Sequence, residues 1–172
     1  LTKGIQEAFQ NGLARHLEDD QVTVLAKGKY GSGVTAVAAV LLKTDFAAIT
    51  NNHDLSEEIF GPASVLVEAQ SKAELLRFAS DLQGHLTATV HGTPEELVEY
   101  ADLIDILEQK VGRLIINGFP TGVEVCQAMM HGGPFPASSE SRSTSVGTAA
   151  IYRFTRPVSY QNFPESLLPD EL

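Results

Sequence analysis

Cysteine and basic side chains are scarce in this chain of 172 residues. Its one cysteine, Cys126, cannot form an intramolecular disulfide, which favours a reducing, cytoplasmic location. Only 12 Lys and Arg residues, scattered from Lys3 to Arg156, stand against 22 Asp and Glu residues, so the formal net charge is -10. Because no positive stripe is available to contact phosphates, we predict that the protein has no nucleic-acid partner.

Long hydrophobic runs are also absent. The longest has seven residues, from Ala36 to Leu42, whereas a membrane-spanning helix needs about 20. No charged segment followed by an apolar stretch opens the chain, so no signal peptide is recognised. With 43% hydrophobic and 20% charged residues, we predict a soluble globular protein with no membrane partner. Because the first residue is Leu rather than Met, we expect a cleaved or partly represented chain.

Three short apolar runs with the composition of buried strands follow one another in the middle of the sequence. They are Ala63 to Ala69, Leu86 to Val90 and Arg113 to Asn117. Helical patterns lie between them, and such short connections require right-handed crossovers and parallel pairing. We therefore predict an α/β fold with a doubly wound parallel sheet. Since ligands gather beyond the carboxyl ends of such strands, Asn117 to Thr121 is expected at the functional end.

Both intervening helices carry terminal signals. Ser71 and Glu74 have the spacing of a capping box, and Gly84 occupies the position of a left-handed C-terminal cap. Thr93 is the predicted N-cap of the second helix, which should run to about Val111 and stop at Gly112.

The flanking segments are less regular. Before Ala63 we expect a helix, a strand, a glycine-rich turn and a second strand, at Thr2 to His16, Val22 to Ala26, Gly28 to Gly33 and Thr35 to Lys43. After Asn117 we expect a packed loop, a short helix and an extended segment, at Gly132 to Ser139, Thr148 to Phe154 and Val158 to Phe163.

Local patterns indicate no catalytic centre. The acidic residues of the second helix spread around its polar side, and the five histidines lack the spacing of metal ligands, so no metal site is predicted. Gly28 to Gly33 lacks the spacing of a phosphate-binding loop. Cys126 is either a nucleophile or a small buried hydrophobe, and its apolar neighbours favour the second interpretation.

Several motifs nevertheless carry a resemblance to a known family. Glu57-Glu-Ile-Phe-Gly-Pro62, directly before a predicted strand, resembles the E-x-F-G-P hallmark of the aldehyde dehydrogenase superfamily. Gly112 to Gly118 resembles the family's strand that ends in Asn. The later motifs together resemble the branch that oxidises alpha-ketoglutaric semialdehyde (2,5-dioxopentanoate), and they are His131 to Ser139, Thr144 to Thr148, Arg153 to Gln161 and the Leu-Leu-Pro tail. The resemblance is specific from Ser56 onward. The chain departs from the superfamily's P-F-G-G-x-K pattern, having Gly-Gly-Pro-Phe-Pro-Ala instead.

The resemblance implies an NAD- or NADP-dependent enzyme in which a cysteine in a G-Q-x-C context attacks the aldehyde. That motif and the amino-terminal cofactor domain are missing from this sequence. Residues 1–154 would therefore be the C-terminal portion of the catalytic domain, and residues 155–172 an oligomerisation strand and tail. We expect no catalytic residue in the chain and no activity from it alone. The competing hypothesis is a non-catalytic α/β binding or assembly module.

The resemblance also implies specific roles for a few side chains. Glu58 would accept hydrogen bonds from the nicotinamide ribose, and Phe60 would pack near the nicotinamide; the alternative is an exposed loop acid and a core residue. The residues proposed for the substrate pocket are Phe119, Pro120, Thr121, Gly122 and Phe135, which are otherwise turn and packing residues. Val158 to Phe163 would pair with a neighbouring subunit, giving a homo-oligomer.

Overall fold

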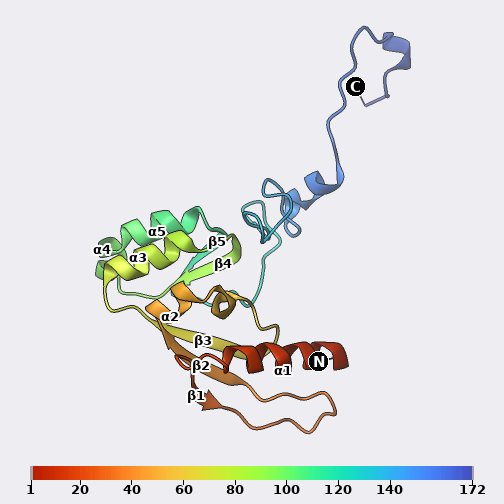
Figure 1. The fold of residues 1–172 in the computed structure, drawn as a ribbon. Helices are drawn as coiled ribbons and strands as arrows, with labels where there is room; N and C mark the ends of the chain where they lie inside the picture. The colour runs from red at the N-terminus through yellow and green to blue at the C-terminus, as the bar shows by residue number, and fades with distance from the viewer. Residues whose placement is uncertain (1, 172) are drawn as a thin grey trace. The chain divides into compact units, whose positions relative to one another are not determined.

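The computed structural model describes residues 2–171, which divide into two compact units that separate after Asp81 (Figure 1). Each unit contains one small β-sheet. None of the helices in this described range is long and apolar enough to cross a membrane.

The first unit begins with a helix that the sequence predicted correctly, α1 (Lys3–His16), whose N-cap Thr2 accepts a hydrogen bond from the Ile5 amide at 3.3 Å. Its remaining elements are β1 (Thr23–Lys27), β2 (Val40–Asp45), α2 (Phe46–Asn51), the 3-10 helix η1 (His53–Ser56), β3 (Ala63–Glu68) and α3 (Lys72–Asp81). The strand predicted from Thr35 begins only at Val40. The preceding residues form a turn instead, closed by the Ala36 amide on the Gly33 carbonyl.

The three strands of the first unit form a sheet in the order β1-β2-β3, antiparallel between β1 and β2 and parallel between β2 and β3. Alternate residues of the central strand β2 face the core, and Leu42 is completely buried. The buried cluster around it comprises Val22, Val40, Leu42, Ala48, Ile49 and Leu55. Leu55, which belongs to this cluster, lies in η1 directly before the segment that leads into β3.

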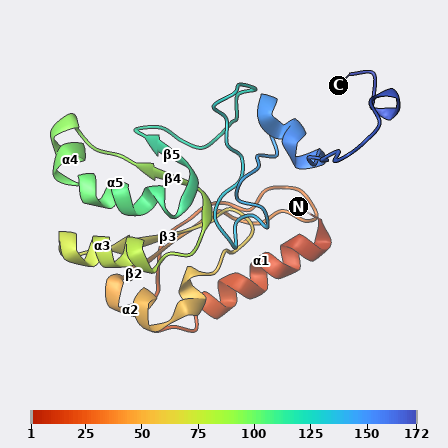
Figure 2. The same cartoon turned by 90° about the horizontal axis from the view of Figure 1, so that it is seen from above.

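The second unit is built on two parallel strands, β4 (His85–Val90) and β5 (Val111–Ile116). Between them lie α4 (Pro94–Glu99) and α5 (Ala101–Glu108), and α5 packs on β5 and buries Leu103 and Leu107 (Figure 2). Two 3-10 helices follow, η2 (Thr148–Phe154) and η3 (Glu165–Leu167). The strands predicted at Leu86 and Arg113 are confirmed, as is the helical turn at Thr148.

The predicted single parallel sheet does not form within residues 2–171. The class is mixed α/β, but β3 pairs with β2, β4 pairs with β5, and no ladder joins β3 to β4. Among the described residues, each sheet leaves its edge strands without a further partner.

The helix starts predicted from the sequence agree with the structure better than the predicted helix ends. Thr93 and Glu96 form a complete capping box, and the Ser71 hydroxyl accepts from the Glu74 amide at 3.2 Å. The prediction of one continuous second helix is wrong. Tyr100 leaves helical geometry (φ -103°, ψ 28°) and divides the helix into α4 and α5. Gly112 does not end a helix but lies inside β5.

Gly84 is not the predicted left-handed cap either. It follows α3 by three residues without a positive φ, and a Cβ there would collide with the carbonyl oxygen of Pro134. A Cβ on Gly112 would collide with the Gly132 carbonyl, and one on Gly133 with the His85 carbonyl. These glycines therefore allow the loop from Gly132 to pack directly on the backbone at the start of β4 and β5.

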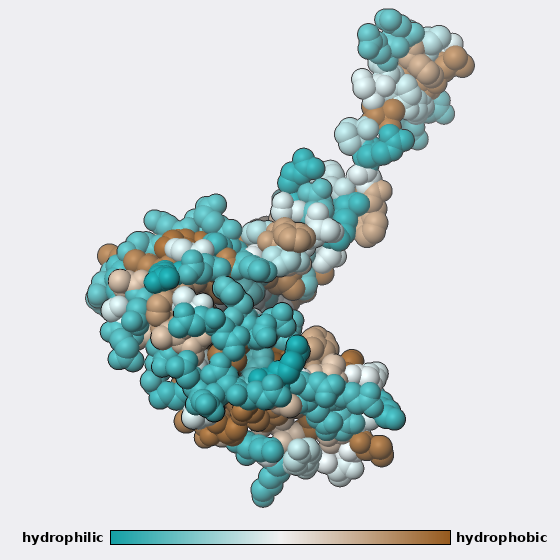
Figure 3. Space-filling view, viewed as in Figure 1, coloured by the Kyte–Doolittle hydropathy of each residue, from teal (hydrophilic) through white to brown (hydrophobic). Residues whose placement is uncertain are grey.

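Apart from η2 and η3, the described chain after β5 is irregular, as predicted for Gly132 to Ser139. Val158 to Phe163 is exposed and forms no ladder with any other part of the described chain; the Tyr160 and Phe163 rings meet edge to face at 5.1 Å. Exposed apolar side chains appear among the polar surface in Figure 3, and those of η2 include Ile151, Tyr152 and Phe154. The proposed pairing of this segment with another subunit stays a prediction.

Candidate functional site

The loop that enters β3 presents the two residues proposed for cofactor binding. Ile59 packs against Gly12, and Gly61, with φ of 155°, faces the ring of Phe9, which is 2% exposed. Glu58 and Phe60, on either side of the half-buried Ile59, are exposed. Phe60 is 63% exposed, so the interpretation of this ring as a core residue is wrong.

At the carboxyl end of the second unit's sheet, Asn117 ties two strand ends together. Its amide donates to the Val90 carbonyl at 2.9 Å. Its side-chain Oδ1 accepts from the Gly92 amide at 2.9 Å, and its Nδ2 donates to the Gly92 carbonyl at 2.8 Å. The residue adopts φ of 51°, a left-handed conformation that asparagine tolerates better than most residues. This clamp fixes where the following loop starts.

That loop carries four of the five residues proposed for the substrate pocket. Phe119 is 76% exposed and its ring lies 5.4 Å from that of His91. The Thr121 amide donates to the Phe119 carbonyl at 2.8 Å, which makes a tight turn, and the Gly122 carbonyl accepts from Arg113 Nη1 at 2.6 Å. The Phe119 ring is therefore presented to solvent by a loop held at both ends.

A cavity of about 170 Å³ lies next to this loop. Its lining residues are Leu86, Thr87, Arg113, Pro120, Met130 and His131. Of the five residues proposed for the pocket, only Pro120 lines it. Phe135 comes from the glycine-rich loop and is 83% exposed. Arg113 is not among the residues predicted from the sequence; the available signal was its position within an apolar strand, where arginine is unusual.

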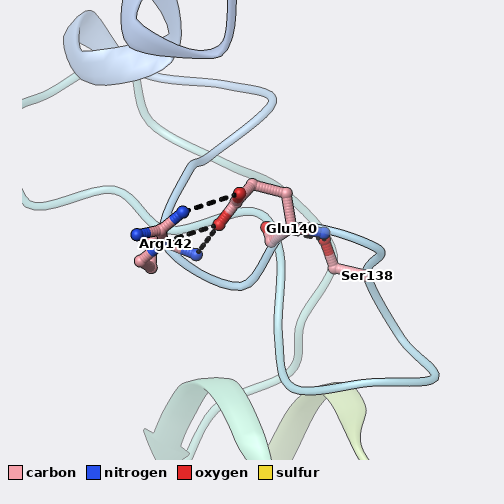
Figure 4. A network of polar contacts seen from close by, with 3 residues as sticks. All are labelled: Ser138, Glu140 and Arg142. Atoms are coloured by element: carbon pink, nitrogen blue, oxygen red, sulfur yellow. Dashed lines mark hydrogen bonds and ion pairs between the residues drawn. The ribbon is translucent and has the colours of Figure 1, made fainter.

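The loop that supplies His131 is held by hydroxyl groups. The buried Thr144 hydroxyl accepts from the His131 amide at 2.8 Å and donates to the Val146 carbonyl at 2.6 Å. Farther out, Glu140 binds the Arg142 side chain and amide, and the Ser138 hydroxyl contacts the Glu140 backbone (Figure 4). Hydrogen bonding to Arg142 lowers the pKa of the Glu140 carboxyl from its ordinary value.

The proposed site residues do not all belong to one unit. Glu58 and Phe60 lie in the first unit, whereas Phe119 to Gly122 and Phe135 lie in the second. Within residues 2–171, no cluster of three potential metal-binding side chains is found.

We expect Asn117→Ala to destabilise the second unit by about 1–3 kcal/mol, since it removes two hydrogen bonds and leaves a Cβ residue in the left-handed region. Asn117→Gly separates the two causes, because it loses the same bonds but relieves the backbone. Urea unfolding of the three proteins would measure the effect. Equal stability of the alanine variant and the parent would show that the clamp contributes nothing.

Comparisons with known proteins place the chain among relatives of greater length. No family model matches it. Alpha-ketoglutaric semialdehyde dehydrogenase 2 of Azospirillum brasilense is 42% identical over 172 residues, and the alpha-ketoglutaric semialdehyde dehydrogenase of Acinetobacter baylyi is 42% identical over 173. Both matches cover 100% of this chain and 33% of the relative. The chain therefore spans about a third of the length of these relatives.

Solved structures show the same fold at lower identity. The Delta-pyrroline-5-carboxylate dehydrogenase of Mycobacterium tuberculosis matches with a TM-score of 0.67 and 20% identity, over 98% of this chain and 32% of that one. The same enzyme bound with NAD matches with a TM-score of 0.62 and 20% identity, over 95% of this chain and 31% of that one.

Proposed function

Because the chain belongs to the aldehyde dehydrogenase superfamily, we propose that it is the C-terminal part of the catalytic domain of an enzyme that oxidises a semialdehyde to a carboxylic acid. The proposed substrate is alpha-ketoglutaric semialdehyde, and the proposed cofactor is NAD or NADP. The observation that carries this proposal is the 42% identity, across the whole chain, to two alpha-ketoglutaric semialdehyde dehydrogenases.

In this proposal the first unit supplies the cofactor contacts. The Glu58 carboxylate has no hydrogen-bond or ion-pair partner elsewhere in residues 2–171, so both oxygens are available to the vicinal hydroxyls of a ribose. Phe60 offers an exposed flat apolar surface two residues away. A bound nicotinamide would accept the hydride from the substrate. Glu58 would fix the ribose and Phe60 would limit the tilt of the ring.

The second unit would contribute one wall of the substrate pocket, through Phe119 to Gly122 and Phe135. Phe119 and Phe135 are 76% and 83% exposed, so both rings are open to contact with a ligand. The unpaired edges of β3 and β4 support the further proposal that strands from outside this chain complete a larger, doubly wound parallel sheet. Val158 to Phe163 would pair with a second subunit in a homo-oligomer.

We expect the 172-residue chain alone not to reduce NAD⁺ or NADP⁺ with 2,5-dioxopentanoate, because it lacks the G-Q-x-C nucleophile motif. A longer protein, in which this sequence follows the missing segment, should do so. Absorbance of the reduced cofactor measures both. Steady turnover by the chain alone that is lost in Cys126→Ser would make Cys126 the nucleophile. Absence of turnover by the longer protein with this substrate would refute the proposed function.

A further inference from the structure

The cavity of the second unit has two kinds of wall. Leu86, Pro120 and Met130 are apolar, whereas Thr87, Arg113 and His131 carry hydrogen-bonding groups. Thr87 and Arg113 are direct partners across the β4-β5 ladder, so their side chains arise next to each other. The Thr87 hydroxyl has no hydrogen-bond partner in the described chain. The Thr87 hydroxyl is therefore available as a hydrogen-bond donor next to the Arg113 guanidinium.

The charge of Arg113 is not neutralised by the protein. Its Nη1 donates to the Gly122 carbonyl and lies 3.9 Å from the Met129 sulfur. Its Nε is buried and has no hydrogen-bond partner, and no carboxylate between residues 2 and 171 forms an ion pair with it. A partly buried cation without a counter-ion is costly, so an anion entering the cavity would relieve that cost.

The dimensions of the cavity restrict the class of anion. Its volume of about 170 Å³ is below the range of roughly 300–1,000 Å³ typical of pockets for drug-sized ligands. A guanidinium matches the planar geometry of a carboxylate, and the three apolar residues match a short aliphatic chain. The cavity thus suits a small molecule with one carboxylate end and an apolar body.

We propose that this cavity binds the carboxylate end of a short-chain carboxylic acid, with Arg113 pairing with the carboxylate and with Thr87 and His131 donating further hydrogen bonds. Leu86, Pro120 and Met130 then enclose the carbon chain. The identification of this ligand with the acid end of a semialdehyde substrate rests on the proposed function. The proposed binding of a carboxylate in this cavity is independent of the proposed function.

The test is binding of 2-oxopentanoate to the 172-residue chain, followed by calorimetry and by the NMR resonances of the His131 ring. We expect saturable binding that shifts these resonances. Pentan-2-one, which has the same chain without the carboxylate, should bind at least tenfold more weakly. Equal binding of the ketone would overturn carboxylate recognition. Inorganic phosphate binding as tightly as the oxo acid would overturn the proposed class of ligand.

Two threonines of β4 give a matched pair of variants. Thr87→Val keeps the shape but removes the free hydroxyl and should weaken binding by roughly threefold to tenfold. Thr89→Val removes a buried hydroxyl that has no partner and does not line the cavity, so it should leave binding unchanged. Arg113→Met should abolish most of the binding; if it fails to fold, the threonine pair still decides. Unaltered binding by Thr87→Val, or equal losses in both threonine variants, would refute the assignment.

Failure of this proposal and failure of the proposed function are distinguishable. Carboxylate binding by the chain, with no aldehyde oxidation by the longer protein, would refute only the function. Aldehyde oxidation by the longer protein, with no binding of 2-oxopentanoate to the chain, would refute only the cavity assignment.

Discussion

Gly112→Ala is expected to destabilise the second unit by about 3 kcal/mol, the upper end of the usual cost of overpacking. The added Cβ would overlap the carbonyl oxygen of Gly132, which is backbone and cannot rotate away as a side chain would. The loop from Gly132 would have to separate from β5, and the neighbouring contact between Gly133 and His85 would be strained with it. Urea unfolding, monitored by circular dichroism, would measure the change.

Gly122→Ala is the control for this experiment. A Cβ at Gly122 has no neighbour within 4 Å, so the substitution only restricts the unfolded chain and should be neutral or stabilising by about 0.4–1 kcal/mol. If the two alanine variants are equally stable, direct backbone packing between the loop and β5 is not required by the fold.

Glu58→Gln should slow hydride transfer in the longer protein by roughly 5- to 150-fold. The substitution keeps the size of the side chain but replaces two charge-assisted hydrogen bonds to ribose hydroxyls by weaker ones, a loss of about 1–3 kcal/mol. The rate should fall more than cofactor affinity, because misplacing the nicotinamide affects the reacting atoms most. Turnover and the isotope effect of a deuterated aldehyde measure these quantities.

Glu57→Gln is the matched control, since Glu57 is also exposed and precedes Glu58 directly. It should leave turnover unchanged. Unchanged turnover in Glu58→Gln with a normal hydride isotope effect, or equal losses in both variants, would remove Glu58 from the cofactor site.

The start of a helix could be predicted from the sequence because the hydrogen bonds that stabilise it join residues close together in the chain. The Thr93 side chain accepts a hydrogen bond from the Glu96 amide, and the Glu96 side chain accepts one from the Thr93 amide. Both residues are recognisable in the sequence because they lie three positions apart. Tyr100 shows the limit of such reasoning. The apolar spacing on either side fits one helix, and a change of backbone angles at a single residue leaves no trace in periodicity.

The glycines were misassigned for a different reason. Local rules explain a glycine by a turn or a helix cap, but Gly84 and Gly112 are required by backbone segments about 50 and 20 residues away, at Pro134 and Gly132. Strand pairing is non-local in the same way. The composition of β3 and β4 identifies them as strands, yet it does not specify which neighbour fills each edge.

For the site, family resemblance selected Glu58 and Phe60, and their exposure agrees with contact to a ligand. The sequence did not reveal Asn117 as a clamp or Arg113 as part of a cavity. Both roles depend on loops that fold back onto β4 and β5, and the side chain of Arg113 has no carboxylate partner among residues 2–171.

The central position of β2 has a consequence for how the first unit opens. Because each β2 amide donates to only one neighbouring strand, exchange of all of them requires separation from both β1 and β3 and exposes the buried Leu42 to water. A fluctuation that frays only one edge strand leaves the hydrogen bonds to the other strand intact. Complete exchange of the β2 amides therefore reports the separation of this strand from both of its neighbours, which opens the centre of the sheet.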